Sequence, residues 1–212
     1  MHNSRMTIKP FSDACERNRD PIFSALRSHF SDRERVLEIG SGTGQHAVYF
    51  AEKMPSLIWQ SSDRAENLPG VRAWLDEAVL PNTPPPIDLD VNDDWPTDRF
   101  DAIFSANTLH IMGWGAVKDL FRGVGAVTTA PAVVCIYGPF RYGGRYTSAS
   151  NAEFDRYLQA RDPASGIRNF EDVNTLSSEQ GLHLLADHRM PANNQLIIWH
   201  KPALSFQTAA PY

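Results

Sequence analysis

The sequence predicts one α/β domain with a mostly parallel β-sheet and helices on both of its faces. Short apolar segments alternate with longer segments of helical periodicity along most of the chain, the pattern of strands joined by crossover helices. Near the C-terminus two apolar segments flank the turn-forming residues 191–194, which is typical of a hairpin and adds one antiparallel strand. A length of 212 residues suits one such domain and is short for two.

The first helix is expected to begin at Asp20, because aspartate is a favoured N-cap residue. Pro21 then occupies the first helical position, where its missing N–H is not needed. Ile22, Leu26 and Phe30 recur on one face of this helix, so we expect that face to pack on the core.

The remaining elements follow from apolar runs and the residues that end them. The run AVVCIY is apolar throughout, as expected for a strand covered on both faces. Pro55 should stop the second helix, and Gly181 is placed to end the last one. The predicted strands lie at 35–39, 57–61, 86–89, 100–105, 132–137, 182–186 and 195–199. The predicted helices after the first lie at 44–54, 68–79, 114–125, 151–160 and 171–180.

Composition and charge exclude several classes of protein. Hydrophobic residues make up 42% and charged residues 21% of the chain, which is typical of soluble globular proteins. A formal net charge of −5 disfavours a nucleic-acid partner, since phosphate-driven binding needs a basic face. The N-terminus lacks the apolar core of a signal peptide, and no apolar stretch approaches the ~20 residues that span a bilayer. We therefore expect a soluble, cytoplasmic protein without a membrane partner.

No metal site is expected from the sequence. Cys15 and Cys135 lack metal-ligand spacing and are expected to be reduced, structural residues. The seven histidines form no H-E-x-x-H or similar ligand pair. Aspartates within 88–94 could hold Mg²⁺, but no spacing among them demands a metal.

The strongest local signal is VLEIGSGTG, in which a strand runs directly into closely spaced glycines and then a helix. Glycine permits positive φ and lets a ligand approach the backbone, while the helix N-terminus favours an anionic group. A dinucleotide-binding G-x-G-x-x-G loop would need its third glycine at Gln45. Here Gly40, Gly42 and Gly44 give E-x-G-x-G-x-G with Glu38 as the acidic residue. That spacing resembles motif I of class I S-adenosylmethionine methyltransferases; a tight turn without a ligand is the alternative.

Aspartates follow the next two strands. Asp63 lies 19 residues after Gly44, close to the ~20-residue offset at which an acidic side chain accepts from ribose hydroxyls. Dehydrogenases use the same device, so Asp63 alone does not discriminate between cofactors. In the methyltransferases that this loop resembles, a side chain at the place of Asp90 accepts from the adenine amino group. With Asp93 and Asp94 nearby, an ordinary acidic loop is the alternative.

The segment SANTLH follows the fourth strand, and its position resembles motif IV of the same methyltransferases, which borders the methionine part of the cofactor. By that resemblance, Asn107 is expected to bond the cofactor's ammonium or a backbone group. His110 is the histidine placed to act as a catalytic base near a methyl acceptor. The alternative for His110 is a packing role with a bond to a carbonyl group.

The chain as a whole resembles a poorly characterised family known as DUF938, related to the vertebrate methyltransferase-like 26 proteins. The resemblance runs from about Phe11 to Lys201. It is carried by 12–22 (SDACERNRDPI), 38–46, 107–111, 137–140 and 160–163. The resemblance implies a Rossmann-like class I methyltransferase fold, with a seven-stranded sheet whose last strand is antiparallel, and S-adenosyl-L-methionine as cofactor. It implies no particular substrate.

Residues 1–30 are expected to form an N-terminal lid and helix segment. Within it, the sequence ERNR is unusually polar for the approach to a helix. One hypothesis is that Arg17 or Asn18 folds over the cofactor, with Arg17 pairing with the methionine carboxylate or a substrate anion. A surface network around the helix cap is an equal alternative.

Residues 139–181, after the fifth strand, are expected to form a substrate-facing insertion. Aromatic side chains there can pack a flat acceptor, glycines permit lid motion, and arginines can hold an acid. A mobile aromatic loop without a ligand is the alternative. The residues expected to face the substrate are Phe140, Arg141, Tyr142, Arg145 and Tyr146.

Together these features predict an S-adenosylmethionine-dependent methyltransferase in a single domain, 1–212, that methylates oxygen, nitrogen or sulfur of a small-molecule acceptor. The predicted cofactor-binding residues are Glu38, Gly40, Gly42, Gly44, Asp63, Asp90, Asn107, Arg17 and Asn18. Two other functions stay open: an NAD(P)-dependent oxidoreductase, against which the glycine spacing speaks, and a regulatory protein that binds the cofactor without turnover. Monomer and homodimer are both compatible with the sequence.

Overall fold

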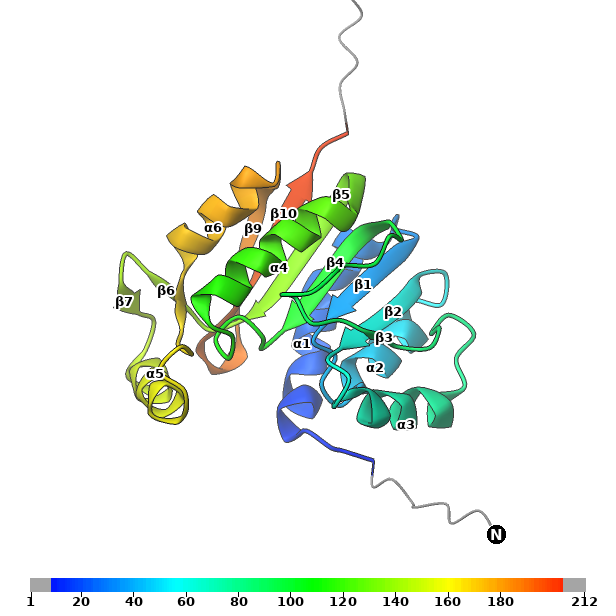
Figure 1. Ribbon diagram of the computed structural model, residues 1–212, viewed down its shortest axis with the longest axis horizontal. Helices are drawn as coiled ribbons and strands as arrows, with labels where there is room; N and C mark the ends of the chain where they lie inside the picture. Colours follow the sequence, from blue (N-terminus) through cyan, green and yellow to red (C-terminus); the bar gives the residue numbers. More distant parts are fainter. Residues whose placement is uncertain (1–8, 204–212) are drawn as a thin grey trace, which may run out of the picture.

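A seven-stranded sheet forms the centre of the computed structural model, which describes residues 9–203 (Figure 1). The strand order is β3-β2-β1-β4-β5-β10-β9; β10 is antiparallel to both of its neighbours, and the other pairs are parallel. The predicted sheet with an antiparallel last strand is confirmed. Its strands are β1 (Arg35–Ile39), β2 (Ile58–Asp63), β3 (Ile87–Asp88), β4 (Phe100–Ala106), β5 (Thr128–Gly138), β9 (His183–Met190) and β10 (Asn194–Lys201). Residues 1–8 of the expected lid segment, and 204–212 of the expected domain, lie outside the described residues.

Helices cover both faces of the sheet, as the alternating pattern predicts (Figure 1). On one face lie α1 (Asp13–Phe30), α2 (Gln45–Lys53) and α3 (Leu68–Ala78), and on the other lie α4 (Trp114–Val127) and α6 (Phe170–Glu179). The yellow helix α5 (Ala149–Arg161) lies beside the sheet rather than over it. Within residues 9–203 no helix combines the length and apolar character needed to cross a membrane.

Alternate residues of each strand contribute to two hydrophobic cores, because successive side chains point to opposite faces of a sheet. Leu37 and Val134 belong to the core under α4 and α6. Their chain neighbours Val36 and Cys135 belong to the core under α1, α2 and α3. The apolar strand sequences are therefore explained by burial on both faces.

The first helix begins earlier than the sequence predicts. Its N-cap is Ser12, whose Oγ accepts from the Cys15 amide at 3.4 Å, and Pro21 lies inside the helix. Asp20 is therefore not the cap; its carboxylate accepts from the Tyr49 hydroxyl of α2. Tertiary contacts to α2 hold the turns before the proline, although proline disfavours a helix interior. The expected apolar face is confirmed, since Ile22, Leu26 and Phe30 are all buried.

A second sheet of three short strands lies between β5 and α6. Its strands are β6 (Phe140–Tyr142), β7 (Arg145–Tyr146) and β8 (Arg168–Asn169), in the order β7-β6-β8. The sequence does not predict these strands, because two or three residues are too few to show alternation. They lie, together with α5 and α6, within the expected insertion 139–181.

Candidate functional site

A cavity of about 1290 Å³ lies along the edge of the sheet where the parallel strands end. Ligands of open α/β sheets bind at this edge, around the point where the strand order reverses, which here lies between β1 and β4. Residues that follow β1, β2, β3, β4 and β5 all contribute to the lining. The sequence-predicted residues that line it are Arg17, Asn18, Gly40, Gly42, Asp63, Asp90, Asn107 and His110.

Two glycines of the loop after β1 have different roles. Gly42 has φ +59°, and a Cβ there would meet nothing within 4 Å, so its backbone is open to the cavity. Gly44 has φ +92°, and a Cβ there would lie 3.1 Å from the Cα of Val71 in α3. Gly44 therefore permits α2 to pack on α3 and does not line the cavity.

Glu38 lies beneath the glycine loop rather than in the cavity lining. Its Oε2 accepts from the Ser41 hydroxyl at 3.0 Å and from Trp59 Nε1 at 2.9 Å. Burial raises the pKa of Glu38 to about 7, although both hydrogen bonds oppose that rise. The acidic residue of the motif thus supports the loop from below, through contacts with Ser41 and β2.

Asp63 joins the end of β2 to the glycine loop. Its Oδ2 accepts from the Gly42 amide at 2.6 Å, and its Oδ1 accepts from the Arg64 amide at 2.8 Å and from Asn67 Nδ2 at 2.7 Å. A carboxylate has about four lone-pair sites, so Asp63 keeps the capacity to accept from a ligand. Beyond it along the sheet edge, Asp90 accepts from the backbone and side-chain amides of Asn92 at 3.0 and 2.6 Å.

The loop after β4 begins with a left-handed residue. Asn107 has φ +59°, which asparagine tolerates better than most residues, and its amide donates to the Tyr137 carbonyl at 2.8 Å. Three residues later, His110 is buried against Phe154, with ring centroids 5.4 Å apart. Burial lowers the pKa of His110 to about 4, with a smaller effect of Arg168, so the ring is neutral at pH 7.

Arg168 of β8 fixes the His110 loop. Its guanidinium donates to the carbonyls of Leu109 at 3.1 Å and Ala164 at 2.9 Å, and also to that of Met112. The Gly166 amide donates to the His110 carbonyl at 2.9 Å. Sequence reasoning missed this contact because it joins segments more than 50 residues apart, and no local pattern signals it.

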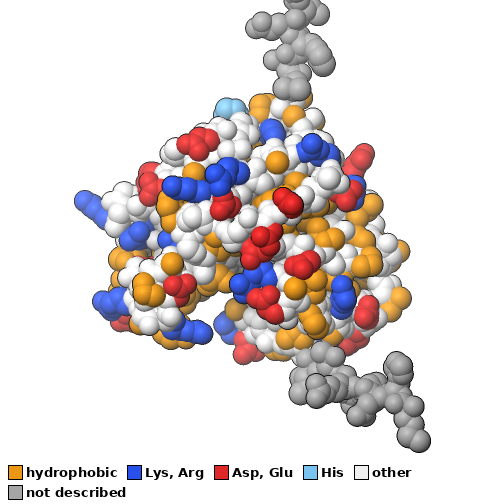
Figure 2. Space-filling model, in the orientation of Figure 1, with side chains coloured by type: hydrophobic (Ala, Val, Ile, Leu, Met, Phe, Trp, Pro, Cys, Tyr) orange, Lys and Arg blue, Asp and Glu red, His pale blue; other side chains and the backbone are white. Residues whose placement is uncertain are grey.

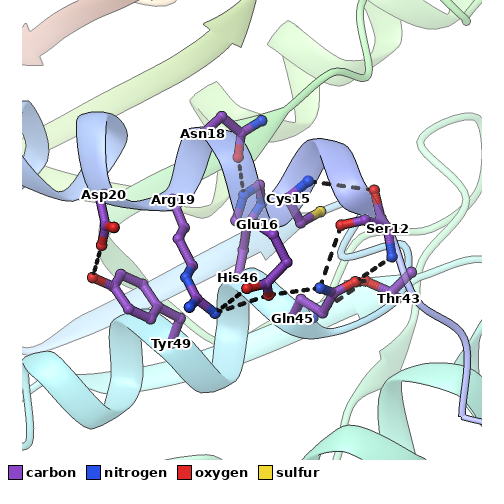
Figure 3. A network of polar contacts seen from close by, with 10 residues as sticks. All are labelled: Ser12, Cys15, Glu16, Asn18, Arg19, Asp20, Thr43, Gln45, His46 and Tyr49. Carbon is purple, nitrogen blue, oxygen red and sulfur yellow. Dashed lines mark hydrogen bonds and ion pairs between the residues drawn. The ribbon is translucent and has the colours of Figure 1, made fainter.

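The first turns of α1 lie over the start of α2 and are fixed by polar contacts (Figure 3). Gln45 Oε1 accepts from the Ser12 amide at 2.6 Å, and its Nε2 donates to Glu16 at 2.9 Å. Asn18 Oδ1 lies 2.7 Å from Nε2 of His46. A network around the cap is therefore present, yet within residues 9–203 Arg17 has no hydrogen bond or ion pair in it and lines the cavity.

The residues predicted to face the substrate lie outside the cavity lining. Phe140 begins β6 and is buried in the core, Arg141 and Tyr142 complete that strand, and Arg145 and Tyr146 form β7. Their hydroxyl groups have structural partners, since Tyr142 donates to Asp187 and Tyr146 to Asp155, both at 2.6 Å. The residue directly before them, Pro139, does line the cavity. The sequence-predicted substrate-facing residues that do not line the cavity are therefore Phe140, Arg141, Tyr142, Arg145 and Tyr146.

Another set of residues, which the sequence analysis missed, closes the far end of the cavity. Tyr137 lies near the end of β5, and residues of α5 and of the β9–β10 turn complete the wall. The turn could have been placed from topology, because β9 runs parallel to β5 and therefore ends at the same edge. No sequence signal places α5 there. The residues lining this end are Tyr137, Ser150, Asn151, Phe154, Pro191, Ala192 and Asn194.

The fold is similar to that of several solved methyltransferases. An O-methyltransferase family protein from Burkholderia thailandensis matches with a TM-score of 0.79 and 14% identity, over 90% of this chain and 58% of that one. The S-adenosylmethionine-dependent methyltransferase SibL matches at 0.75 and 22%, over 89% and 56%. Human N-acetylserotonin methyltransferase, in complex with S-adenosylmethionine, matches at 0.75 and 15%, over 90% and 53%. This chain thus spans about half the length of these proteins, and at such identities the likeness concerns the fold.

A family model gives the sequence-level relation. The model, described as "Protein of unknown function (DUF938)", matches residues 9–201, which is nearly the whole described chain. The segments SDACERNRDPI and NTLHI, on which the resemblance was based, both lie inside the match. The chain therefore belongs to the DUF938 family.

Proposed function

We propose that this protein is an S-adenosylmethionine-dependent methyltransferase that acts on a small molecule. The observation that carries the proposal is the contact of Asp63 Oδ2 with the Gly42 amide, 2.6 Å long, at the cavity wall. This contact places the carboxylate of Asp63 beside the glycine backbone of the loop. A carboxylate can accept from ribose hydroxyls, and a glycine backbone lets the rest of a nucleoside ligand approach closely. The likeness of the fold to methyltransferases supports the same assignment.

The cavity residues fit this cofactor. The open space at Gly42 lets a ligand approach the backbone, and the volume of about 1290 Å³ exceeds the 300–1,000 Å³ of usual ligand pockets, so a second molecule has room. Asp63 would hold the ribose hydroxyls, Asp90 the adenine amino group, Asn107 the ammonium and Arg17 the carboxylate. When bound, S-adenosylmethionine would supply a methyl group attached to a positively charged sulfur.

The chain's own task in such a reaction is mainly to position the reactants. The α1 turns, the glycine loop and α5 line the cavity, so a ligand bound between them would displace water and be oriented by their side chains. His110 is neutral at pH 7 and lines the cavity, so it can take up a proton from the acceptor. Its low pKa makes it a weak base, which favours acceptors that lose a proton readily.

The proposal includes the finer expectations from the sequence. These are kinship with the vertebrate methyltransferase-like 26 proteins, one domain over residues 1–212, a cytoplasmic location, and either a monomer or a homodimer. The charge of −5 supports a partner other than nucleic acid.

Transfer of a labelled methyl group tests the activity. The protein and methyl-tritiated S-adenosylmethionine are incubated with an extract of its source cells, which is then separated into small molecules and macromolecules. We expect label in the small-molecule fraction, and a loss of about 100-fold or more with Asp63→Ala, which removes the ribose acceptor. Glu66→Ala, an exposed residue of the same loop, is the control. Label in protein or nucleic acid alone would overturn the small-molecule part, and binding without any transfer would favour a regulatory protein.

A further inference from the structure

The cavity has a charge asymmetry along the sheet edge. Its lining carboxylates, among residues 9–203, are Asp63 and Asp90, which follow the neighbouring strands β2 and β3. The opposite end is formed at β5 and β10, on the other side of β1 and β4 in the strand order. One end of the cavity therefore carries two carboxylates, together with Arg64, whose guanidinium pairs with Glu66 at 2.8 Å. The other end has no lining carboxylate in the described part of the chain.

The end at β5 and β10 has apolar walls and uncharged polar groups; we call it the distal end and define it as Tyr137, Pro139, Asn151, Phe154, Ala192 and Asn194. The ring of Phe154 stacks on that of Tyr157 at 6.5 Å and meets His110 edge to face. In the space-filling view the surface is hollowed between α5 and the N-terminal part of α1 (Figure 2). From α1, the exposed Arg17 adds a positive charge to the lining.

The polar groups of the distal end keep hydrogen-bonding capacity for a ligand. The Tyr137 hydroxyl accepts from Asn194 Nδ2 at 2.9 Å, so its own proton can be donated to a ligand. Asn151 Nδ2 donates to Thr147 Oγ1 and to the Asn193 carbonyl, both at 2.9 Å. Its Oδ1 has no donor among the described residues and can accept from a ligand.

We propose that the distal end binds the methyl acceptor, and that the acceptor is a flat, largely apolar molecule with a hydroxyl group and no positive charge. This inference rests on the proposed function. A hydroxyl can use the free proton of Tyr137 and the free oxygen of Asn151, and an apolar ring can pack on Phe154. An ammonium group that enters the distal end would lose its hydration, and no lining carboxylate of the described residues would replace it.

Three probes that share one ring test the charge selectivity. They are 4-ethylphenol, which is neutral, 4-hydroxyphenylacetate, which is anionic, and tyramine, which is cationic. Binding is measured by calorimetry on protein alone and on protein saturated with S-adenosylhomocysteine, and ring signals of Phe154 and His110 are followed by NMR. We expect the neutral and anionic probes to bind and shift these signals, and tyramine to bind about tenfold more weakly or worse.

A charge-introducing variant provides the matched control. Ala192 lines the distal end with φ +57°, a conformation that asparagine and aspartate adopt more readily than alanine. Ala192→Asp places a carboxylate there, and Ala192→Asn has the same shape without the charge. We expect tyramine to bind Ala192→Asp about tenfold more tightly than Ala192→Asn, because the two variants differ only in charge.

Two sets of results would overturn the inference. One is tyramine binding to the unmodified protein as tightly as 4-ethylphenol; the other is failure of all three probes to bind or to shift Phe154 and His110. Neither result bears on the cofactor, because S-adenosylhomocysteine binding is recorded separately. Conversely, charge-selective binding of the probes to a protein that does not bind S-adenosylhomocysteine would retain the site and reject the methyltransferase.

Discussion

The guanidinium of Arg168 holds the loop that carries His110, whereas burial is the main reason that the His110 ring is neutral. The guanidinium donates to three carbonyls around the loop 109–112, and its charge adds to the effect of burial on the His110 pKa. A residue that acts through main-chain carbonyls leaves no motif in the sequence. His110 could be identified as a candidate from its position after a predicted strand. The role of Arg168 is visible only in the folded structure, where its contacts with Leu109 and Met112 form.

Arg168→Met should loosen the His110 loop and raise the pKa of His110. Unfolding free energy is expected to fall by about 2–4 kcal/mol, since three carbonyls lose their donor. The pKa of His110 rises from about 4 because a nearby cation is lost, while burial still holds it below its usual range. Urea unfolding and NMR titration of the ring measure the two effects.

Two further variants separate the clamp from the charge. Arg168→Lys keeps the charge, so the loss of stability should persist while the pKa of His110 stays low. Arg122→Met, which removes an exposed arginine paired with the half-buried Asp119, should change stability by less than about 0.5 kcal/mol. A His110 pKa that is the same in Arg168→Met as in the unmodified protein would exclude the electrostatic role.

Glu38 should make stability fall as pH rises. Its pKa is about 7 in the folded protein against an ordinary 4.5, so the folded state binds more protons than the unfolded state between these values. Stability from this group is fully present below pH 4.5 and is lost as pH rises through 7. Glu38→Gln removes this loss and keeps an oxygen for Ser41 and Trp59, which both donate to one oxygen of Glu38.

The measurement compares urea unfolding of Glu38→Gln and the unmodified protein at pH 4.5 and pH 8. The variant should gain up to about 3 kcal/mol relative to the unmodified protein between these pH values. His46 and His110 titrate in both proteins, so their effects cancel in the comparison. A relative stability that is the same at both pH values would show that Glu38 is ionised normally.

At the scale of elements, the glycine loop combines a packing position with a binding position. Gly44→Ala sets a Cβ against the backbone of Val71, so we expect a loss of about 2–4 kcal/mol in unfolding free energy. Gly42→Ala meets open space, so its cost is the left-handed backbone alone, about 1 kcal/mol. S-adenosylhomocysteine affinity should instead fall about tenfold or more, because the methyl group enters the cavity. Equal stability losses for the two variants would contradict this division.

Elements were predictable where their own sequence determines them. The strand β1 and the helix α4 follow from apolar periodicity, and both are buried as expected. The predicted start of α1 is wrong because a proline such as Pro21 is typical of the first turn of a helix. In the structure, contacts of Ser12 and Glu16 with Gln45 stabilise the helical turns that precede Pro21. The short strands of the second sheet gave no pattern, since pairing with distant residues defines them.

At the scale of the whole molecule, the cavity joins parts of the chain that are far apart in sequence. Asp63, Asp90 and Asn107 could be placed together from the sequence, because parallel strands end at one edge. Phe154 and Asn151 could not, since α5 reaches the cavity through its packing and not through the order of the strands. The aromatic residues of β6 were predicted to face the substrate, but they belong to the second sheet and do not line the cavity.

The central claim is that the glycine loop and Asp63 bind an adenosyl sulfur compound rather than a dinucleotide. Calorimetry of the purified protein with S-adenosylhomocysteine and with NAD(H) tests it most directly. We predict saturable binding of S-adenosylhomocysteine in the micromolar range, weakened about tenfold or more by Asp63→Ala, and no binding of NAD(H). Binding of NAD(H) by a protein that does not bind S-adenosylhomocysteine would contradict the account and favour an oxidoreductase.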